Sequence, residues 1–547
     1  MNTKWSKTVT AGIMATGMII LGCTSLDTMG PGSETVAIAG RVVDSLGHAV
    51  PEARVVLLPA RYNPLTDPAI PDTMVGITDD AGHYTMKAPG TGRYSVEAAD
   101  SNSKRKSLVT GINVDKKDTV TVPESILRRP GALRVVLPDT ANDASGYVYL
   151  PGTTCYASVQ NGFATVDAVP AGFISSVNYA DTAVPDKNHV IQANLTVLIN
   201  DTLVIMDIIS WKYSKKLYLN TTSGGASVGQ NVYDFPVLVR LTSSNIDFSL
   251  VTSDGSDIRF TKSNGAPLPY EVERWDAGAQ AAEIWVRVDT VYGDAITQSL
   301  TMYWGNPIAT NESNSAVVFD TTAGFAGVWH LGEDGDNVFD ATARAFNGMN
   351  AGTTPAGGIV GNARKFANGD YIKIAGLLKT PANITMSAWV SSDTLNWGQN
   401  NNWGQEIVSI GDYALIRLDD AFGIGTSGWY QNKPIAPGPD SSFVMVNSGR
   451  FLANTGWHFL AFSINTTTHE QALYIDGVRC AIANDVNPIC YSGLGTDTYI
   501  GIHGNGEKIY NFSGRMDEVR VNKTSLSADW IKLCFMNQKE RDALVKW

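Results

Sequence analysis

The chain has 547 residues, a formal net charge of −12, and charged side chains at only 17% of positions. This length exceeds what one hydrophobic core serves, so we expect several domains and exclude a single-domain protein. The acidic balance repels phosphate backbones and excludes nucleic acid as an expected partner.

Residues 1–22 predict an export signal. Lys4 and Lys7 precede an uncharged apolar stretch over 9–22, which is too short for a mature membrane span. The stretch ends in Ile-Leu-Gly-Cys at Cys23, which resembles a bacterial lipobox. The resemblance implies a lipid on the Cys23 thiol and an exported protein anchored in the membrane of the cell envelope, at the outer membrane or cell surface. The alternative is an ordinary secretory peptide with an incidental Cys.

Two small sandwiches are expected next. Residues 23–34 are small, polar and rich in Gly and Pro, which predicts a tether. Alternating strands and turn formers over 35–125, with Thr-Asp-Asp-Ala-Gly-His-Tyr at 78–84, resemble the carboxypeptidase regulatory-like family. That resemblance implies a prealbumin-like sandwich that serves as a spacer or adhesion module. Short strands over 126–208 predict a second small β-sandwich.

The remaining chain predicts two larger β domains. The strand series over 209–310, which includes Leu-Pro-Tyr-Glu-Val-Glu-Arg-Trp-Asp at 268–276, resembles a bacterial domain of unknown function that commonly precedes LamG modules. Residues 320–547 carry Gly-Val-Trp-His-Leu at 327–331 and further strand motifs that resemble a LamG/concanavalin A-like jelly roll. The expected fold is therefore all-β, with multidomain β-sandwiches ending in a concanavalin A-like jelly roll.

Aromatic side chains are expected to fill the jelly roll between its two sheets. The predicted core residues are Trp329, Trp389, Trp457 and Phe462. A short C-terminal helix follows, with Ser527 as its N-cap.

Five cysteines are present. With Cys23 lipidated, four remain, and Cys480 and Cys490 lie close together near a strand pair of an exported chain. We expect these two to form a disulfide. Cys155 and Cys534 are expected to be free and buried, or paired with each other.

Two motifs invite a catalytic interpretation. His330 and Glu333 match half of a zinc carboxypeptidase site, but no third ligand is evident nearby, so a structural role is favoured. Residues 225–229 match Gly-x-Ser-x-Gly, which as a nucleophile elbow requires a strand before it and a helix after it. Here the motif joins two strands, and a hairpin loop is favoured.

A glycoside hydrolase would need two carboxylates about 5–5.5 Å apart on one face. Asp517 and Glu518 are adjacent, so a regular strand would point them to opposite faces. We therefore expect no catalytic site. The LamG resemblance implies instead a structural calcium ion, for which Asp340, Asp370 and Asp517 stand at the family's positions.

The predicted ligand site is an amide-rich segment over 391–431. Its aromatic residues are Trp397, Trp403, Trp429 and Tyr430. Exposed aromatic faces stack on sugar rings, and amides bond hydroxyls; the alternative is local packing of a long loop.

These features favour a non-catalytic, cell-surface binding module for polysaccharide or a surface partner, which binds through the LamG loops. The alternatives are a structural or adhesive spacer protein and a glycan-active hydrolase.

Overall fold

The computed structural model describes residues 35–547 apart from 116–118, 138–143, 210, 308, 368, 394–403, 420–423, 431–442 and 485–487. Over this part of the chain the predicted all-β class is confirmed, because packed sheets make up the domains and the longest helix is α2 (Ala528–Gln538). None of the helices described has the length and apolar character of a membrane span. The predicted signal, Cys23 and the tether lie outside the described residues.

The first sandwich belongs to a compact unit of its own. Its sheets have the orders β4-β1-β7, with β8 also on β1, and β3-β2-β5-β6. In β4 buried and exposed residues alternate, so Tyr84 and Met86 face the core. The strands are β1 (Val36–Val43), β2 (Arg54–Pro59), β3 (Val75–Ile77), β4 (His83–Ala88), β5 (Gly92–Asp100), β6 (Arg105–Val114), β7 (Val120–Thr121) and β8 (Ser125–Ile126).

The second sandwich has the sheets β11-β10-β13-β14 and β12-β9-β15. Its strands are β9 (Gly131–Val136), β10 (Gly146–Tyr149), β11 (Tyr156–Ser158), β12 (Phe163–Val169), β13 (Gly172–Asp181), β14 (His189–Val197) and β15 (Thr202–Met206).

The middle domain combines residues 213–304 with the C-terminal strand β39 (Val545–Lys546). Its sheets have the orders β19-β18-β22-β16-β39 and β17-β21-β20. The short helix α1 (Ser315–Val318) leads into the next domain. The other strands are β16 (Tyr213–Leu219), β17 (Val232–Thr242), β18 (Arg259–Lys262), β19 (Pro267–Leu268), β20 (Tyr270–Asp276), β21 (Ala281–Val291) and β22 (Ser299–Trp304).

The jelly roll consists of two stacked sheets, in the orders β26-β27-β38-β29-β34-β35-β36, with β23 also on β38, and β24-β25-β28-β37-β30-β31-β32-β33. Trp329 and Phe462 fill its core as predicted, whereas Trp457 is only half-buried, beneath the Arg515 guanidinium. Its strands are β23 (Phe325–Trp329), β24 (Asn337–Val338), β25 (Gly348–Ala351), β26 (Thr354–Gly357), β27 (Asn362–Phe366), β28 (Tyr371–Ile374), β29 (Ile384–Ser392), β30 (Gly404–Ile410), β31 (Ala414–Asp419), β32 (Ile424–Tyr430), β33 (Phe443–Phe451), β34 (His458–Asn465), β35 (Glu470–Ile475), β36 (Val478–Asn484), β37 (Thr498–Ile500) and β38 (Gly514–Asn522).

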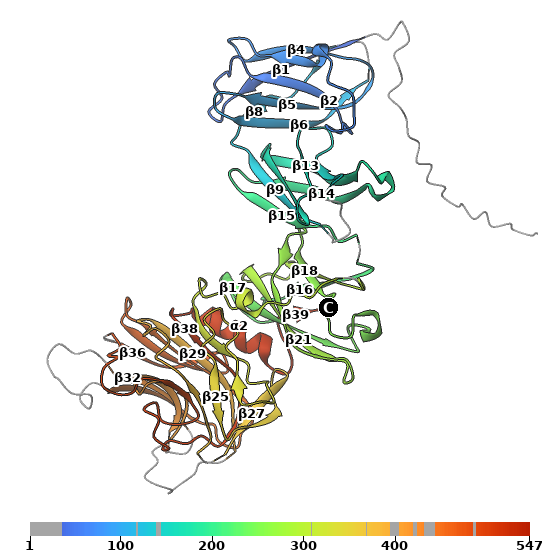
Figure 1. Ribbon diagram of the computed structural model, residues 1–547. Coiled ribbons are helices and arrows are strands. Elements are labelled where there is room, and N and C mark those ends of the chain that lie inside the picture. Colours follow the sequence, from blue (N-terminus) through green and yellow to red (C-terminus); the bar gives the residue numbers. More distant parts are fainter. Residues whose placement is uncertain are drawn as a thin grey trace, which may run out of the picture. The chain divides into compact units, whose positions relative to one another are not determined.

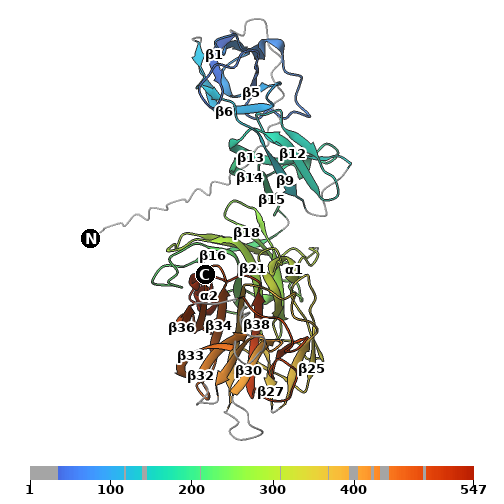
Figure 2. The ribbon, with the colours of Figure 1, turned by 90° about the vertical axis from the view of Figure 1, so that its left-hand side faces the viewer.

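The middle domain and the jelly roll share one hydrophobic core, which we call the seam. Trp285 of β21, Trp389 of β29 and Trp530 of α2 are all buried in it. Helix α2 lies beside β17, and the chain then returns to pair β39 with β16 (Figure 1). Figure 2 shows the C-terminus beside β16 from a second direction. Trp389 is therefore buried as predicted, but in the seam and not between the sheets of the jelly roll.

The predicted disulfide between Cys480 and Cys490 is wrong for this structure, in which both are free thiols. Cys480 lies within β36 with its side chain packed against the jelly-roll core, and its Sγ contacts the Val478 carbonyl at 3.2 Å. Proximity in sequence does not suffice to form this disulfide, because the pairing of β36 with β35 fixes the position of Cys480. Cys155 and Cys534 are both buried.

Asn537 of α2 connects the helix to the middle domain. Its Oδ1 accepts the Leu238 amide at 2.7 Å and its Nδ2 donates to the Leu238 carbonyl at 3.0 Å. We expect Asn537→Ala to lower the unfolding free energy by on the order of 2–4 kcal/mol, because it leaves two buried backbone groups unsatisfied. Urea unfolding measures this, with exposed Asn484→Ala as the control; equal stability of the two variants contradicts it.

Candidate functional site

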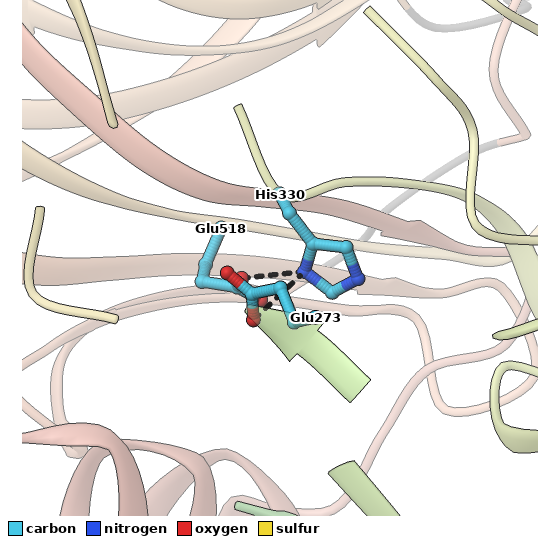
Figure 3. Close-up of side chains that lie close together, drawn as sticks. All are labelled: Glu273, His330 and Glu518. Carbon is cyan, nitrogen blue, oxygen red and sulfur yellow. Dashed lines mark hydrogen bonds and ion pairs between the residues drawn. The ribbon is translucent and has the colours of Figure 1, made fainter. Parts of the chain in front are cut away.

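Three acidic side chains and one histidine meet at the seam. β20 supplies Glu271 and Glu273, β38 supplies Glu518, and His330 directly follows β23. Figure 3 shows Glu273 and Glu518 turned toward the imidazole ring. Because β20 belongs to the middle domain, neither domain alone holds the complete cluster.

Both ring nitrogens of His330 face carboxylates. Nδ1 lies 2.6 Å from Glu518 Oε1 and 3.6 Å from Glu273 Oε2, and Nε2 lies 3.3 Å from Glu271 Oε2. Burial alone would lower the pKa of His330, but the charges of Glu518, Glu271 and Glu273 raise it well above the ordinary value. The imidazole therefore carries both protons and donates on both sides.

A β-bulge places both Asp517 and Glu518 at the seam. Glu518 has a φ of 51°, and the register between β38 and β29 shifts at this point. Met516 and Val519 face the jelly-roll core, while Asp517 and Glu518 both point away from it. The expectation that these neighbouring acids face opposite sides is therefore wrong, because it assumed a regular strand.

Glu518 is held between two cations. Besides His330, its Oε2 pairs with the Arg520 guanidinium through Nη2 and through Nε at 3.1 Å. That guanidinium lies over the Trp285 ring, 4.4 Å from its centre. Burial would raise the pKa of Glu518, but His330 and Arg520 hold it below its usual value. Glu518 therefore remains ionised although it is fully buried.

Glu273 and Asp517 behave in the opposite way. Burial raises the pKa of Glu273 well above its usual value; the His330 charge opposes this and the Glu518 charge adds to it. Its Oε2 accepts the Trp285 indole N–H at 2.6 Å. Burial and Glu518 also raise the pKa of Asp517 well above the usual range. The surroundings thus favour the protonated form of Glu273 and Asp517 and the ionised form of Glu518.

A cavity of about 350 Å³ opens beside the cluster and is lined by both domains. Glu333 lies in its wall with a buried Oε2 that has no hydrogen-bond partner in the described part of the chain, and Phe339 is 55% exposed. The carboxylates of such a wall accept hydrogen bonds from the hydroxyl groups of a ligand, and the Asn362 amide can both donate and accept them. An exposed aromatic ring offers a face for stacking. The lining residues are Glu271, Glu273, Arg274, Ser315, His330, Gly332, Glu333, Phe339, Asp340, Ala341 and Asn362.

Ligand atoms of Glu273, His330 and Glu518 lie within 4.8 Å of one another, a spacing that suits a metal ion. An ion here would compete with the Arg520 guanidinium and with the proton that His330 shares with Glu518 at 2.6 Å. The residues therefore fit an internal charge cluster better than a metal centre.

The two motifs with a catalytic interpretation take structural positions. Glu333 lies in the cavity wall with His330, but its Oε1 accepts the Phe339 amide at 2.7 Å. Ser227 lies in the loop between β16 and β17, two strands with no helix between them, so the nucleophile-elbow geometry is excluded there.

The three predicted calcium ligands do not converge among the described residues. Asp340 accepts the Val328 amide at 3.0 Å and the Thr342 amide at 2.9 Å. Asp370 accepts the Ala367 amide at 2.8 Å, and Asp517 accepts two backbone amides. Each of the three carboxylates already has a hydrogen-bonding role in the fold. Calcium binding by these residues stays a prediction.

Most of the predicted aromatic ligand site lies outside the described residues. Trp397 and Trp403 fall in the range 394–403, and the side chains of Trp429 and Tyr430, at the end of β32, are also not described. The Glu-Val-Glu alternation over 271–273 was the signal in the sequence that could have revealed the seam cluster.

Two regions of the chain match known families. Residues 254–332 match a domain of unknown function (DUF2341), and residues 366–532 match the concanavalin A-like lectin/glucanases superfamily. No curated protein matches the chain.

Solved structures show low similarity to part of the chain. The binding domain of Paraclostridial Mosquitocidal Protein 1 is 14% identical over 39% of this chain, with a TM-score of 0.30, and the match spans 52% of that domain. Domain 4 of AbnA, a GH43 extracellular arabinanase from Geobacillus stearothermophilus in complex with arabinotriose, is 17% identical over 38% of this chain and 97% of its own, with a TM-score of 0.30.

Substitution of Glu273 and substitution of Glu518 should affect the unfolding free energy differently. Glu273→Gln mimics the protonated form that burial favours, so we expect almost unchanged stability at neutral pH. Glu518→Gln leaves Arg520 and His330 buried beside a neutral group, and we expect a loss of about 3–5 kcal/mol. Urea unfolding of both variants tests this, and a larger loss for Glu273→Gln contradicts it.

The seam should weaken as pH rises. The stabilisation from charged His330 is complete below the ordinary histidine pKa of about 6.5 and is lost as pH rises through its raised folded value. Glu273 and Asp517, whose pKa values are also raised, act in the same direction, and their loss begins at about pH 4, where the unfolded carboxyl groups ionise. We expect a further fall of the unfolding free energy from about pH 6 upward, and this further fall should be smaller in His330→Gln. Exposed His83→Gln is the control, and identical profiles for both variants exclude the assignment.

Proposed function

We propose that this protein is an exported, lipid-anchored carbohydrate-binding protein that takes a glycan chain into the seam cavity without cleaving it. The observation that carries the proposal is the cavity wall, in which hydroxyl-binding groups surround an exposed ring. The match of residues 366–532 to a superfamily of lectins and glucanases supports carbohydrate as the ligand class. Anchoring through Cys23 and a spacer role for the first two sandwiches rest on the sequence alone.

Non-catalytic binding is supported by the state of Glu518. This carboxylate is fully buried, does not line the cavity, and is held by Arg520 and His330. A nucleophile must reach the anomeric carbon, whereas Glu518 is screened from a ligand in the cavity. The groups that do line it, such as Glu333 and Asn362, suit hydrogen bonds to hydroxyls.

Binding at the cavity should depend on its exposed ring. We expect Phe339→Ala to weaken glycan binding by roughly five- to tenfold, because the loss of a stacking face is worth about 1 kcal/mol. Phe451→Ala removes a ring that is similarly exposed, 51% against 55%, but lies on β33, and should leave affinity unchanged. A glycan array followed by calorimetry on the best ligand measures this. Equal losses in both variants, or no glycan bound at all, contradict the proposal, and the latter favours a structural or adhesive spacer.

One observation favours a second candidate, a glycan hydrolase. Oxygen atoms of Glu273 and Glu518 lie within 4.8 Å of each other, and their surroundings shift the two pKa values in opposite directions, as in an acid and nucleophile pair. Incubation with a glycan panel and mass spectrometry of released products separates the two candidates. Products that disappear in Glu273→Gln establish the hydrolase and overturn the binding proposal; a complete absence of products dismisses the hydrolase.

A further inference from the structure

A second cluster of ligand-type side chains lies in the jelly roll and shares no residue with the seam cavity. Glu406 comes from β30, Asp412 from the turn that follows β30, and His503 from the loop after β37. Their ligand atoms lie within 4.8 Å of one another. Strands β30 and β37 pair directly, so the sheet itself brings the three segments together.

The cluster contains a buried oxygen with no hydrogen-bond partner. Glu406 is fully buried, and its Oε2 accepts the Gly504 amide at 3.0 Å. Its Oε1 is also buried and accepts no hydrogen bond from the residues that the structure describes. The nearby Ser409 hydroxyl donates to the Gly411 carbonyl at 2.5 Å and, together with the Gly504 amide, lowers the pKa of Glu406, but it leaves Oε1 without a hydrogen bond of its own. Buried carboxylate oxygens are nearly always partnered, and this exception therefore points to a missing ligand.

The charges in the cluster are consistent with a missing cation. Burial raises the pKa of Glu406 to about 8, and the Asp412 charge adds to this. Burial raises the pKa of Asp412 as well, against the opposing charges of His503 and Arg417. Arg417 is the cross-strand neighbour of Glu406, and its charge opposes the rise in the pKa of Glu406; its guanidinium lies 5.5 Å from the centre of the Tyr510 ring. A cation placed among the three ligands would offset the burial of both carboxylates.

We propose that Glu406, Asp412 and His503 bind a divalent transition-metal ion of the zinc type. One imidazole and two carboxylates suit Zn²⁺, whereas Ca²⁺ prefers oxygen ligands alone. Three protein ligands leave a fourth position open to water or to a group on a ligand.

The histidine must rearrange its proton for this binding. His503 Nε2 faces Asp412 Oδ2 at 3.6 Å, and Nδ1 accepts the Asn505 amide at 3.3 Å. An ion at Nε2 shifts the ring proton to Nδ1 and displaces the long contact from Asn505. Ligand atoms around tetrahedral zinc are about 3.3 Å apart, so Asp412 and His503, which lie outside strands, also move closer.

The test is titration of the chelator-stripped protein with Zn²⁺ by calorimetry. We expect one high-affinity equivalent, and at least tenfold weaker binding in Glu406→Gln and in the more accessible Asp412→Asn. His458→Gln is the matched control, because that histidine contacts Asp476 at 2.8 Å and Thr455 but belongs to no group of three ligands among the described residues. Zinc should also raise the melting temperature of the wild type more than that of Asp412→Asn.

Cobalt identifies the ligands directly. Bound Co²⁺ should show visible bands without sulfur-to-metal charge transfer, because the proposed ligands are nitrogen and oxygen. A charge-transfer band assigns the ion to the free thiols and overturns the proposal. The proposal is also overturned if no zinc binds, or if zinc affinity is unchanged in Asp412→Asn. Zinc affinity that is lost in Glu273→Gln overturns it too, because that result assigns the ion to the seam.

Discussion

The burial of one ionised carboxylate between two cations is the constraint on which the seam depends. Glu518 is fully buried, and its ion pairs with His330 and Arg520 make its charge tolerable there. These partners come from the jelly roll, while Glu271 and Trp285, which contact them, come from the middle domain. The middle domain thus adds a carboxylate to His330 and an aromatic face to Arg520, so the buried charges couple the two sandwiches in addition to their shared apolar core.

The polar wall of the cavity also depends on the buried charge cluster around Glu518. Carboxylates that face His330 from β20 also line the open space beside it, so the groups that could meet a ligand are fixed from behind by the buried cluster. Side chains held in this way lose little conformational freedom when they bind, which favours recognition of a flexible, hydroxyl-rich chain.

The sequence predicted the all-β fold class of the chain far better than its site. Alternation and turn residues identified strands of the first sandwich such as β4, where exposed and buried residues alternate from His83 to Ala88, because a sandwich core imposes a period of two. The cluster was missed because it joins residues from two domains, and no local pattern encodes which sandwich faces which. The bulge at Glu518 could not be predicted either, because no Gly or Asn between Met516 and Val519 indicates a left-handed backbone conformation. The predicted disulfide between Cys480 and Cys490 is wrong because closeness in sequence does not bring two side chains together once a strand fixes the direction of one of them.

The return of the C-terminal segment to the middle domain has a consequence for biosynthesis. Asn537 contacts Leu238 across 299 positions, and β39 completes the edge of β16. While the chain emerges from the ribosome or an export channel, the first two sandwiches can form in order, but the middle domain waits with an open strand edge. Such an edge invites pairing with other chains. Holding factors that shield nascent β-strands would thus matter most for this stretch of the polypeptide.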